Sequence, residues 1–395
     1  MTTFDLLLIG YGNVAKRFAA LLDEQRQLLA RQYGFRARIV GIATRTHGQA
    51  YGAPVVSGFP PSLAGNSREL RRDQAEARSA KAGSRTLSAG DPTSGPAKAG
   101  HYRNQATLAF LQDALKRSAA AARQRRLIVI ETTTLDIERG EPAIRHIRTA
   151  LAAGAHVITA NKGPVAFAYD GLARAARRAD RRFLFEGAVM DGVPIFNLVR
   201  HTLPAVEILG FRGVVNSTTN FILTAMEQGH AFEAALAEMQ ARGIAEADAS
   251  LDVDGWDAAA KAAALANVLM GAHITPKDVE RHGIGPATGR LAREAQAAGR
   301  RLKLVARAER HQSGVTARVA PEALPGDDLL AGLEGQQNAL ILTTDLLEEI
   351  AIVQRSGSLT QTAYALLSDL IAVARGIVGV PGARRSPVRA PRRRR

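Results

Sequence analysis

The feature that most constrains the fold is the short apolar run Phe4–Ile9, which leads directly into the glycine turn Gly10-Tyr-Gly12-Asn-Val-Ala15. Apolar residues recur at helical spacing over the next stretch, Val14–Ala30. A strand, a glycine turn and a helix in this order open the βαβ unit of a dinucleotide-binding domain. Gly10 permits the tight turn, and Gly12 lets the backbone approach a pyrophosphate that the first N–H groups of the helix bind. We therefore expect four residues of the turn to contact a dinucleotide: Gly10, Gly12, Asn13 and Val14.

The end of the second predicted strand, Ala37–Ala43, bears on which dinucleotide is bound. A site selective for NAD usually ends this strand with Asp or Glu, whose carboxylate binds the 2′-hydroxyl of the ribose. Here no acidic residue is present, and Arg45 lies in the turn. Because a cation suits a 2′-phosphate, the sequence favours NADP as the cofactor, with NAD as the alternative.

Strands and helices continue to alternate along the chain. The predicted elements are the helix Leu108–Ala122, the strand Leu127–Ile130, the helix Pro142–Ala153 and the strand His156–Thr159. Such alternation predicts an α/β fold with a Rossmann-type, doubly wound parallel sheet. Ligands bind at the carboxyl ends of the strands in such sheets. Thr132 and Thr133, which follow the strand Leu127–Ile130, are therefore expected to contact the cofactor.

The formal net charge of +15 belongs mostly to two segments outside these elements. Residues 58–103 contribute +4 and residues 384–395 contribute +7. Both segments are poor in aliphatic residues, and such a composition cannot bury enough apolar surface to fold. We expect a disordered low-complexity insertion at 58–103 and a solvated Arg/Pro-rich tail. Since no RNA- or DNA-binding motif accompanies them, we expect no nucleic-acid partner.

The sequence lacks several features, and their absence excludes several classes of protein. It contains no cysteine, which rules out disulfide scaffolds, thiol catalysis and zinc–thiolate sites. It has no uncharged apolar stretch of about 18 residues, so we expect no membrane span. No signal peptide is recognisable before the first strand, and we expect a cytoplasmic protein.

The densest group of charged residues surrounds a predicted helix from Asp257 to Met270. Lys261 lies four residues after Asp257, on the same face of the helix, within reach of an ion pair. The neighbouring residues are almost all alanine, so the helix is predicted to be buried. A lysine is rarely found on a buried helix unless it is paired with an acidic residue or has a function. Asp257 and Lys261 are therefore candidate site residues. A second lysine, Lys162, follows the strand His156–Thr159 at its carboxyl end.

Four motifs, in this order, resemble those of the homoserine dehydrogenase family. They are Gly10-Tyr-Gly-Asn-Val-Ala15, Thr159-Ala-Asn-Lys-Gly-Pro164, the stretch Glu186–Pro194, and Gly243-Ile-Ala-Glu-Ala-Asp248 continuing to Lys261. Asn216-Ser-Thr-Thr-Asn220 is similar to the family's Asn-Gly-Thr-Thr-Asn stretch, with Ser217 where the family prefers Gly. The resemblance covers Phe4 to Arg375 without residues 58–103.

This resemblance implies an NAD(P)-dependent oxidoreductase that interconverts L-aspartate 4-semialdehyde and L-homoserine in threonine and methionine biosynthesis. It implies catalytic roles for Lys261, Lys162 and Asp257, with Lys162 also beside the cofactor, and substrate-binding roles for Glu246 and Asp252. It further implies a monovalent cation, Na⁺ or K⁺, in the loop that contains Glu186, Val189 and Asp191. The family also implies a homodimer or a higher homo-oligomer.

The residues themselves agree with this chemistry. Hydride transfer needs a positioned nicotinamide and a donor of a proton to the developing alkoxide. A lysine ammonium can donate that proton and stabilise the negative charge. We therefore expect Lys261 to be the proton donor, with Lys162 assisting, while Glu246 and Asp252 hold the substrate ammonium.

These observations predict four parts of the chain. Residues 1–163 form the nucleotide-binding domain, and residues 164–339 form a second, α+β domain for substrate binding and dimerisation. Residues 340–376 return to the nucleotide-binding domain, and residues 377–395 form the tail.

Two other functions stay open at this stage. The charged residues indicate a pocket for a zwitterion, but they do not indicate how long the bound molecule is. The substrate could therefore be another small amino acid. The loop Arg355–Ser358 stands where the family has a Gly-rich loop, and its side chains and the insertion are also compatible with a catalytically impaired nucleotide-binding homologue.

Overall fold

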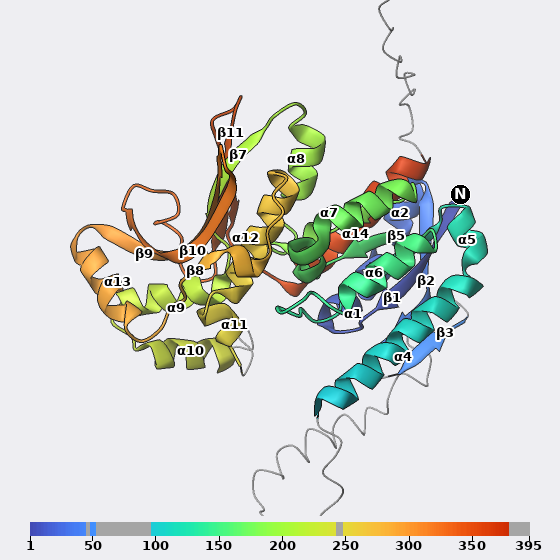
Figure 1. Cartoon of the computed structure of the whole chain (residues 1–395), viewed down its shortest axis with the longest axis horizontal. Coiled ribbons are helices and arrows are strands. Elements are labelled where there is room, and N and C mark those ends of the chain that lie inside the picture. Colours follow the sequence, from blue (N-terminus) through green and yellow to red (C-terminus); the bar gives the residue numbers. More distant parts are fainter. Residues whose placement is uncertain (45–47, 53–95, 242–247, 379–395) are drawn as a thin grey trace, which may run out of the picture.

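The computed structural model describes residues 1–44, 48–52, 96–241 and 248–378, which form two units lying side by side (Figure 1). Two predicted site residues, Arg45 and Glu246, lie outside the described residues. Most of the predicted insertion, up to residue 95, and the tail from residue 379 also lie outside them.

The N-terminal unit contains a six-stranded sheet in the order β3-β2-β1-β4-β5-β6. Its strands are β1 (Thr2–Ile9), β2 (Phe35–Ala43), β3 (Gln49–Tyr51), β4 (Leu127–Glu131), β5 (His156–Thr159) and β6 (Phe183–Leu184). All neighbours pair in parallel except β3, which runs antiparallel to β2 at the edge. This order and the parallel pairing confirm the predicted Rossmann-type sheet.

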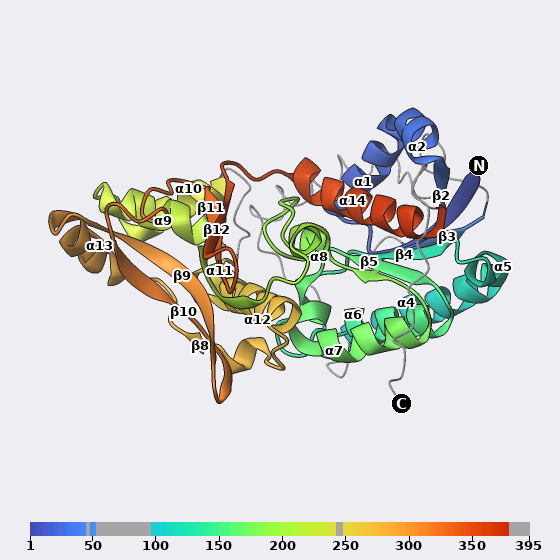
Figure 2. The ribbon, with the colours of Figure 1, turned by 90° about the horizontal axis from the view of Figure 1, so that it is seen from above.

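Helices cover both faces of this sheet (Figure 2). On one face lie α1 (Asn13–Glu24), α2 (Arg26–Tyr33) and α14 (Leu359–Val378), which pack on Phe4, Leu6 and Leu8 of β1. On the other lie α4 (Pro96–Arg117), α6 (Ala143–Ala152) and α7 (Lys162–Arg178), which pack on Leu7 and Ile9. Both faces of the strand are buried, and therefore its sequence is continuously apolar rather than alternating.

Three predicted boundaries differ from the structure. The sheet extends past residue 163, because α7 and β6 complete it after the predicted domain end. Within residues 340–376 only α14 returns to the first unit, since β11 (Asn338–Thr344) and β12 (Glu349–Gln354) pair within the second. The helix predicted at Leu108–Ala122 begins earlier, at Pro96, where proline is tolerated in a first helical turn. It is also interrupted at Ser118, after which α5 (Ala119–Arg123) follows.

The second unit is built on a mainly antiparallel sheet in the order β12-β11-β7-β9-β10-β8. The strands not yet introduced are β7 (Ile208–Val214), β8 (Glu280–Arg281), β9 (Arg300–His311) and β10 (Gly314–Pro325). Helices α9 (Ser217–Glu227), α12 (Trp256–Leu269) and α13 (Thr288–Ala297) pack against it, and α10 (Phe232–Ala241) and α11 (Ser250–Val253) lie beside α9 (Figure 1). This unit is the predicted second α+β part of the fold.

Helix α12 joins the two units, because it packs against α7 on one side and against β9 and β10 on the other. Alanines at positions 258–260 and 262–264 are almost fully buried, and their small side chains allow this close packing on two sides. The start of α12 therefore lies where the two units meet. None of the described helices is long and apolar enough to cross a membrane.

Candidate active site

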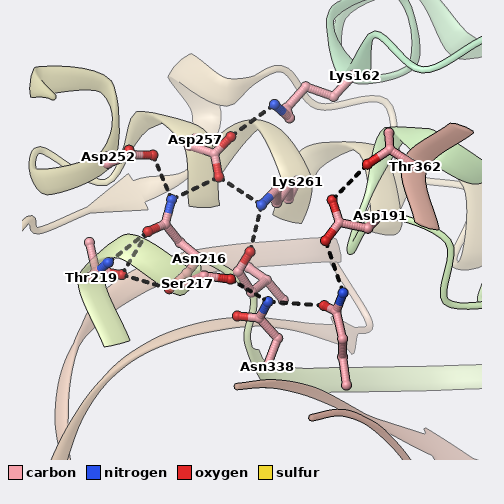
Figure 3. Close-up of polar contacts among 12 residues, drawn as sticks. Lys162, Asp191, Asn216, Ser217, Thr219, Asp252, Asp257, Lys261, Asn338 and Thr362 are labelled. Carbon is pink, nitrogen blue, oxygen red and sulfur yellow. Dashed lines mark hydrogen bonds and ion pairs between the residues drawn. The ribbon is translucent and has the colours of Figure 1, made fainter. Parts of the chain in front are cut away.

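The predicted site lysines come together at the boundary between the units (Figure 3). Lys162 is the first residue of α7, directly after β5, and the side chain of Asn161 caps that helix by accepting a hydrogen bond from the N–H of Gly163 at 2.9 Å. Asp257 and Lys261 lie on the first turns of α12, which enters from the second unit. The site is therefore assembled from residues about 100 positions apart in the sequence, as the topology of the two units requires.

Asp257 is the centre of this group. One carboxylate oxygen, Oδ1, lies 2.9 Å from Lys162 Nζ, and the other, Oδ2, lies 2.8 Å from Lys261 Nζ. The three side chains keep between 13% and 20% of their surface exposed, so the cluster is mostly desolvated but still accessible. One carboxylate thus holds two ammonium groups that solvent still reaches.

The charges shift the pKa values in opposite directions. Burial alone would raise the pKa of the Asp257 carboxyl, but the two lysines outweigh burial and hold it well below its usual range. Burial would lower the pKa of Lys261, yet Asp257 outweighs burial and raises it. Lys261 is therefore an ammonium at neutral pH. Two of its three N–H donors go to Asp257 and to the carbonyl oxygen of Val215, at 2.6 Å, which leaves one donor for a substrate.

Asn216 organises the carboxylates of this site. Its Nδ2 donates to Asp252 Oδ1 at 2.7 Å and to Asp257 Oδ2 at 2.9 Å, while its Oδ1 accepts from the N–H of Thr219 at 2.9 Å and caps α9. Burial, and then the nearby Asp257, raise the pKa of Asp252. The sequence motif contained Asn216, but nothing in its spacing showed that a helix cap would also bridge two carboxylates.

The glycine turn has the geometry that a dinucleotide phosphate requires. Gly10 has a positive φ of 88°, and a Cβ there would lie 2.6 Å from the carbonyl oxygen of Thr132. A Cβ on Gly12 would meet nothing within 4 Å, so open space lies above this residue. Among the described residues no side chain caps the first turn of α1, and its N–H groups, which begin at Asn13 and Val14, remain for an anion. These residues therefore fit a dinucleotide.

A buried carboxyl group shapes the loop after β4. Glu131 accepts hydrogen bonds from the N–H and hydroxyl of Thr133 and from the hydroxyl of Thr159, and its burial raises its pKa. The hydroxyl of Thr132 donates instead to the carbonyl oxygen of Gly10 at 3.1 Å. Asn161 Nδ2 donates to the carbonyl oxygen of Thr133 at 3.1 Å. Glu131, whose role the sequence did not reveal, therefore ties the loop of Thr132 and Thr133 to the residue before Lys162.

The proposed cation loop uses its carboxylates for protein contacts. Glu186 accepts hydrogen bonds from the backbone N–H groups at positions 195, 196 and 197, at 2.6 to 2.9 Å. Asp191 accepts from Gln354 Nε2 at 2.9 Å and from the hydroxyl of Thr362 at 3.0 Å. Val189 has no side-chain ligand, and no group of three or more metal-binding side chains occurs among the described residues. These carboxylates fit a structural role, and only backbone carbonyl groups of the loop remain as cation ligands.

The residues at 217 and 355–358 lie close to the site. The Ser217 hydroxyl contacts Asn338 Nδ2 at 2.8 Å, and Asn338 Nδ2 also donates to Gln354 Oε1 at 3.1 Å (Figure 3). Gly357 packs so closely on Asp191 that a Cβ there would lie 2.7 Å from its carboxylate. A chain of polar contacts thus connects the second sheet to α14, beside the lysine cluster.

Comparison with known proteins gives one consistent result. The family model for homoserine dehydrogenase matches residues 194–371. The NAD(+)-dependent homoserine dehydrogenase of Pseudomonas canavaninivorans is 34% identical over 372 residues, which cover 94% of this chain and 96% of that protein. The homoserine dehydrogenase of Methanocaldococcus jannaschii is 40% identical over 245 residues, 62% of this chain and 71% of that protein.

Solved structures agree with the sequence matches. A homoserine dehydrogenase from Thiobacillus denitrificans superposes with a TM-score of 0.72 and 28% identity, covering 97% of this chain and 76% of that one. A putative homoserine dehydrogenase from Archaeoglobus fulgidus superposes with a TM-score of 0.72 and 27% identity, covering 94% and 99% of the two chains. Both units of the fold therefore have counterparts in one family.

Proposed function

The chain belongs to the homoserine dehydrogenase family, and we propose that it interconverts L-aspartate 4-semialdehyde and L-homoserine by hydride transfer with a pyridine nucleotide. The observation that carries this proposal is the lysine–aspartate–lysine cluster, which lies where the second unit meets the carboxyl ends of the nucleotide-binding strands. The reaction belongs to the biosynthesis of threonine and methionine.

The glycine turn and the neighbouring loop are the residues that would hold the nucleotide. The N–H groups at Asn13 and Val14 would bind its phosphates, above the open space at Gly12. Thr132 and Thr133 lie next to this turn, where their loop would contact the nicotinamide half. When bound, the nicotinamide supplies or accepts the hydride, and the protein supplies orientation and proton transfer.

The substrate would lie between the lysines and the Asp252 carboxylate. Asp252 is held in place by Asn216 and would bind the substrate ammonium. Glu246, the second residue assigned to this task, lies outside the described residues. Lys162 and Lys261 present ammonium groups to the oxygen atoms of the substrate, so opposite ends of the zwitterion meet opposite charges.

Lys261 is the residue that we assign to proton transfer. As hydride adds to the aldehyde carbon, the carbonyl oxygen gains negative charge, and the free N–H of Lys261 donates its proton to that oxygen to form the hydroxyl. Asp257 keeps the lysine protonated and points its remaining donor at the site. Lys162, held by the other oxygen of Asp257, adds a second positive charge that stabilises the alkoxide.

NADP is our proposal for the preferred nucleotide. No acidic residue occurs between Glu24 and Glu69, so none follows β2 to bind a ribose 2′-hydroxyl, and Arg45 is available in the sequence for a 2′-phosphate. The Pseudomonas relative is NAD(+)-dependent, so the preference must be measured on this protein. A ratio of kcat/KM for NADPH over NADH below one would reverse the assignment.

We also propose a monovalent cation, Na⁺ or K⁺, bound by the backbone carbonyl groups of Glu186, Val189 and Asp191. What supports it is the family resemblance of the loop. Because both carboxylates already accept hydrogen bonds from protein donors, the backbone carbonyl groups are the ligands that we propose. Replacing K⁺ and Na⁺ in the assay by a bulky quaternary ammonium ion should then lower activity, and equal rates in all salts would contradict the proposal.

A homodimer formed through the second unit is the expected assembly. Large apolar side chains are exposed on and near β7, β11 and β12, with exposed fractions of 37% for Leu209, 65% for Leu346 and 47% for Val353. Such a surface favours association with another copy. Val353→Glu should shift the mass measured by light scattering towards the monomer, and an unchanged mass would place the interface elsewhere.

The experiment that tests the proposed function is a turnover assay with L-aspartate 4-semialdehyde and reduced nucleotide, run with NADPH and NADH in parallel. Lys261→Ala should abolish turnover but leave NADPH binding intact, because Lys261 contacts no part of the glycine turn. Lys116→Ala, on the exposed surface of α4, is the matched control and should retain full activity. Wild-type kcat in the Lys261 variant would disprove its assigned role.

A further inference from the structure

A second cavity lies away from the lysine cluster, as a groove of about 730 Å³ between α14 and α8 (Phe196–Thr202). One face of α14, from Tyr364 to Gly376, forms one wall, and residues of α8 and β6 form the other. The thirteen residues of helix from Tyr364 to Gly376 extend over about 18 Å, so the groove is elongated. Its volume lies within the range of small-molecule sites.

Three arginines face this groove without carboxylate partners. Arg182, Arg200 and Arg375 line it, and no acidic side chain does. Among the described residues none of the three forms an ion pair: Arg200 donates to Asn197 Oδ1 at 3.1 Å, and Arg375 lies over the ring of Tyr33 at 5.1 Å. The other arginines of the fold often pair with acids, such as Arg301 with Glu227 at 2.7 Å.

The arginines of the groove also influence the pKa values of neighbouring groups. Burial, and then Arg200 and Arg182, lower the pKa of His201, which lies on the same wall. Arg200 also lowers, through space, the pKa of two buried carboxyl groups behind the groove, Glu186 and Asp369, which burial raises. Both of these carboxyl groups accept hydrogen bonds from backbone or amide N–H groups, and among the described residues neither forms an ion pair with the arginines.

The floor of the groove is apolar. Leu184, Pro194, Leu198, Ile371 and Ala372 line it between the arginines. A ligand that fits must therefore carry an apolar body as well as a negative charge. An inorganic anion would leave the floor uncovered, and a neutral hydrocarbon would leave the guanidinium groups without a partner.

The groove is separate from the site of the proposed reaction. Its lining includes none of the residues at the glycine turn, in the loop after β4 or in the lysine cluster. Substrate and nucleotide therefore bind elsewhere. Because α14 lies on the nucleotide-binding sheet and Asn197 of α8 donates to Asp369 of α14 at 3.2 Å, the groove spans a contact between α8 and α14.

We propose that this groove is a binding site for a small amphipathic organic anion, with a carboxylate or phosphate held by Arg182, Arg200 and Arg375 and an apolar body lying on Leu198 and Ile371. The ligand is not a reactant, since the lining of the groove includes none of the residues of the lysine cluster. The proposal does not depend on the identity of the substrate.

The test uses 1-anilinonaphthalene-8-sulfonate, an anion with an apolar body whose fluorescence rises in apolar surroundings, on the full chain saturated with NADPH. Saturation occupies the nucleotide site, so that only binding elsewhere is seen. Octanoate and octyl phosphate should displace the probe and 1-octanol should not, and the stronger of the two anions identifies the preferred head group. Arg182→Gln and Arg375→Gln should each weaken probe binding by about tenfold, the loss expected for one charge-assisted contact.

Arg293→Gln, on the exposed face of α13, is the matched control and should leave probe binding unchanged. Each variant must bind NADPH with wild-type affinity, which separates loss of the groove from loss of the fold. Probe binding as strong in the Arg182 and Arg375 variants as in the wild type would overturn the proposal and would point to the Arg-rich tail, which they retain. Displacement of the probe by 1-octanol as strong as that by octanoate would also overturn the proposal. A loss of probe binding when the protein self-associates would overturn it as well.

Discussion

Two lysines in the second unit, Lys261 and Lys303, are both largely removed from solvent but differ in their partners and in their pKa shifts. Lys261 donates to the carbonyl oxygen of Val215 at 2.6 Å, and Lys303 of β9 donates to the carbonyl oxygen of Leu333 at 2.5 Å. Their other partners differ, because Lys261 meets the Asp257 carboxylate at 2.8 Å while Lys303 meets only the amide oxygen of Asn220 at 3.2 Å.

This difference reverses the effect of burial on the pKa. Desolvation lowers the pKa of both lysines, but for Lys261 the charge of Asp257 outweighs it and raises the pKa. Lys303 has no ion pair within the described residues, and burial lowers its pKa to about 8. Lys261 keeps 16% of its side chain exposed, whereas Lys303 is fully buried. Burial alone therefore does not distinguish the two lysines, and the proposed catalytic role of Lys261 rests on its carboxylate partner together with its access to solvent.

The largest effect that tests this contrast is on turnover. Lys261→Met removes the proposed proton donor, and kcat for semialdehyde reduction should fall by about a thousandfold or more. Lys303→Met removes a lysine that no substrate can reach, so its kcat should stay within about threefold of the wild type. Initial rates at saturating nucleotide measure both. A Lys303 variant as inactive as the Lys261 variant would remove the distinction.

Stability against pH gives the next largest effect, and it concerns Lys303. Its pKa is about 8 in the folded chain and about 10.5 when unfolded, so between these values the unfolded chain binds more protons. The free energy of unfolding should therefore rise with pH there, by about 2 kcal/mol between pH 8 and pH 10. Denaturant titrations of wild type and Lys303→Met at both pH values isolate this contribution. The same pH dependence of stability in the wild type and in the Lys303→Met variant would contradict the lowered pKa of Lys303.

The pH dependence of homoserine oxidation tests Lys261 in turn. In this direction the lysine must accept a proton, so only its neutral amine is active, and a raised pKa keeps that form scarce. The kcat for oxidation should increase about tenfold per pH unit up to a pKa above 10.5, while kcat for reduction should stay level. A plateau in oxidation beginning near pH 8 would instead indicate a lysine with the properties of Lys303.

Much of the fold could be predicted because it depends on local patterns. The run Phe4–Ile9, the turn at Gly10 and the alternation of strands and helices determine a parallel sheet whichever way the rest of the chain packs. The ends of that sheet could not be predicted, because β6 has only two residues, Phe183 and Leu184, and leaves no periodic pattern. The assignment of β11 and β12 to the second sheet likewise depends on pairing with β7, which is distant in sequence.

The site was predictable only where spacing carried the information. Asp257 and Lys261 are one helical turn apart, so their ion pair follows from the sequence. The contact of Asp257 with Lys162 depends on how α12 meets α7, and the two bonds from Asn216 depend on where α9 begins. Lys303 stands among the apolar residues of a strand, and neither its burial nor its amide partner has a local signal.

The smallest expected effects come from substitutions of two asparagines near these lysines. Asn216 bonds the carboxylate partner of Lys261, and Asn220 bonds Lys303 directly. Asn216 holds Asp252 and Asp257, and Asn216→Ala should lower kcat/KM for the semialdehyde by about tenfold, because the two carboxylates lose their shared donor. Asn220 accepts from Lys303 and donates to the carbonyl oxygen of Gln337 at 3.0 Å, so Asn220→Ala should cost about 1–2 kcal/mol of stability.

Both variants lose side-chain hydrogen bonds and therefore stability, so stability alone cannot tell them apart, and the pH profile must decide. Without the amide of Asn216, repulsion from Asp257 should raise the pKa of Asp252 further, and the acid side of the kcat/KM profile should move to higher pH. Asn220 contacts neither carboxylate, so Asn220→Ala should leave the acid side of the kcat/KM profile at the same pH as in the wild type. A shift in both variants would mean that α9 acts on the site as one rigid element, and that Asn216 has no separate part in holding its charges.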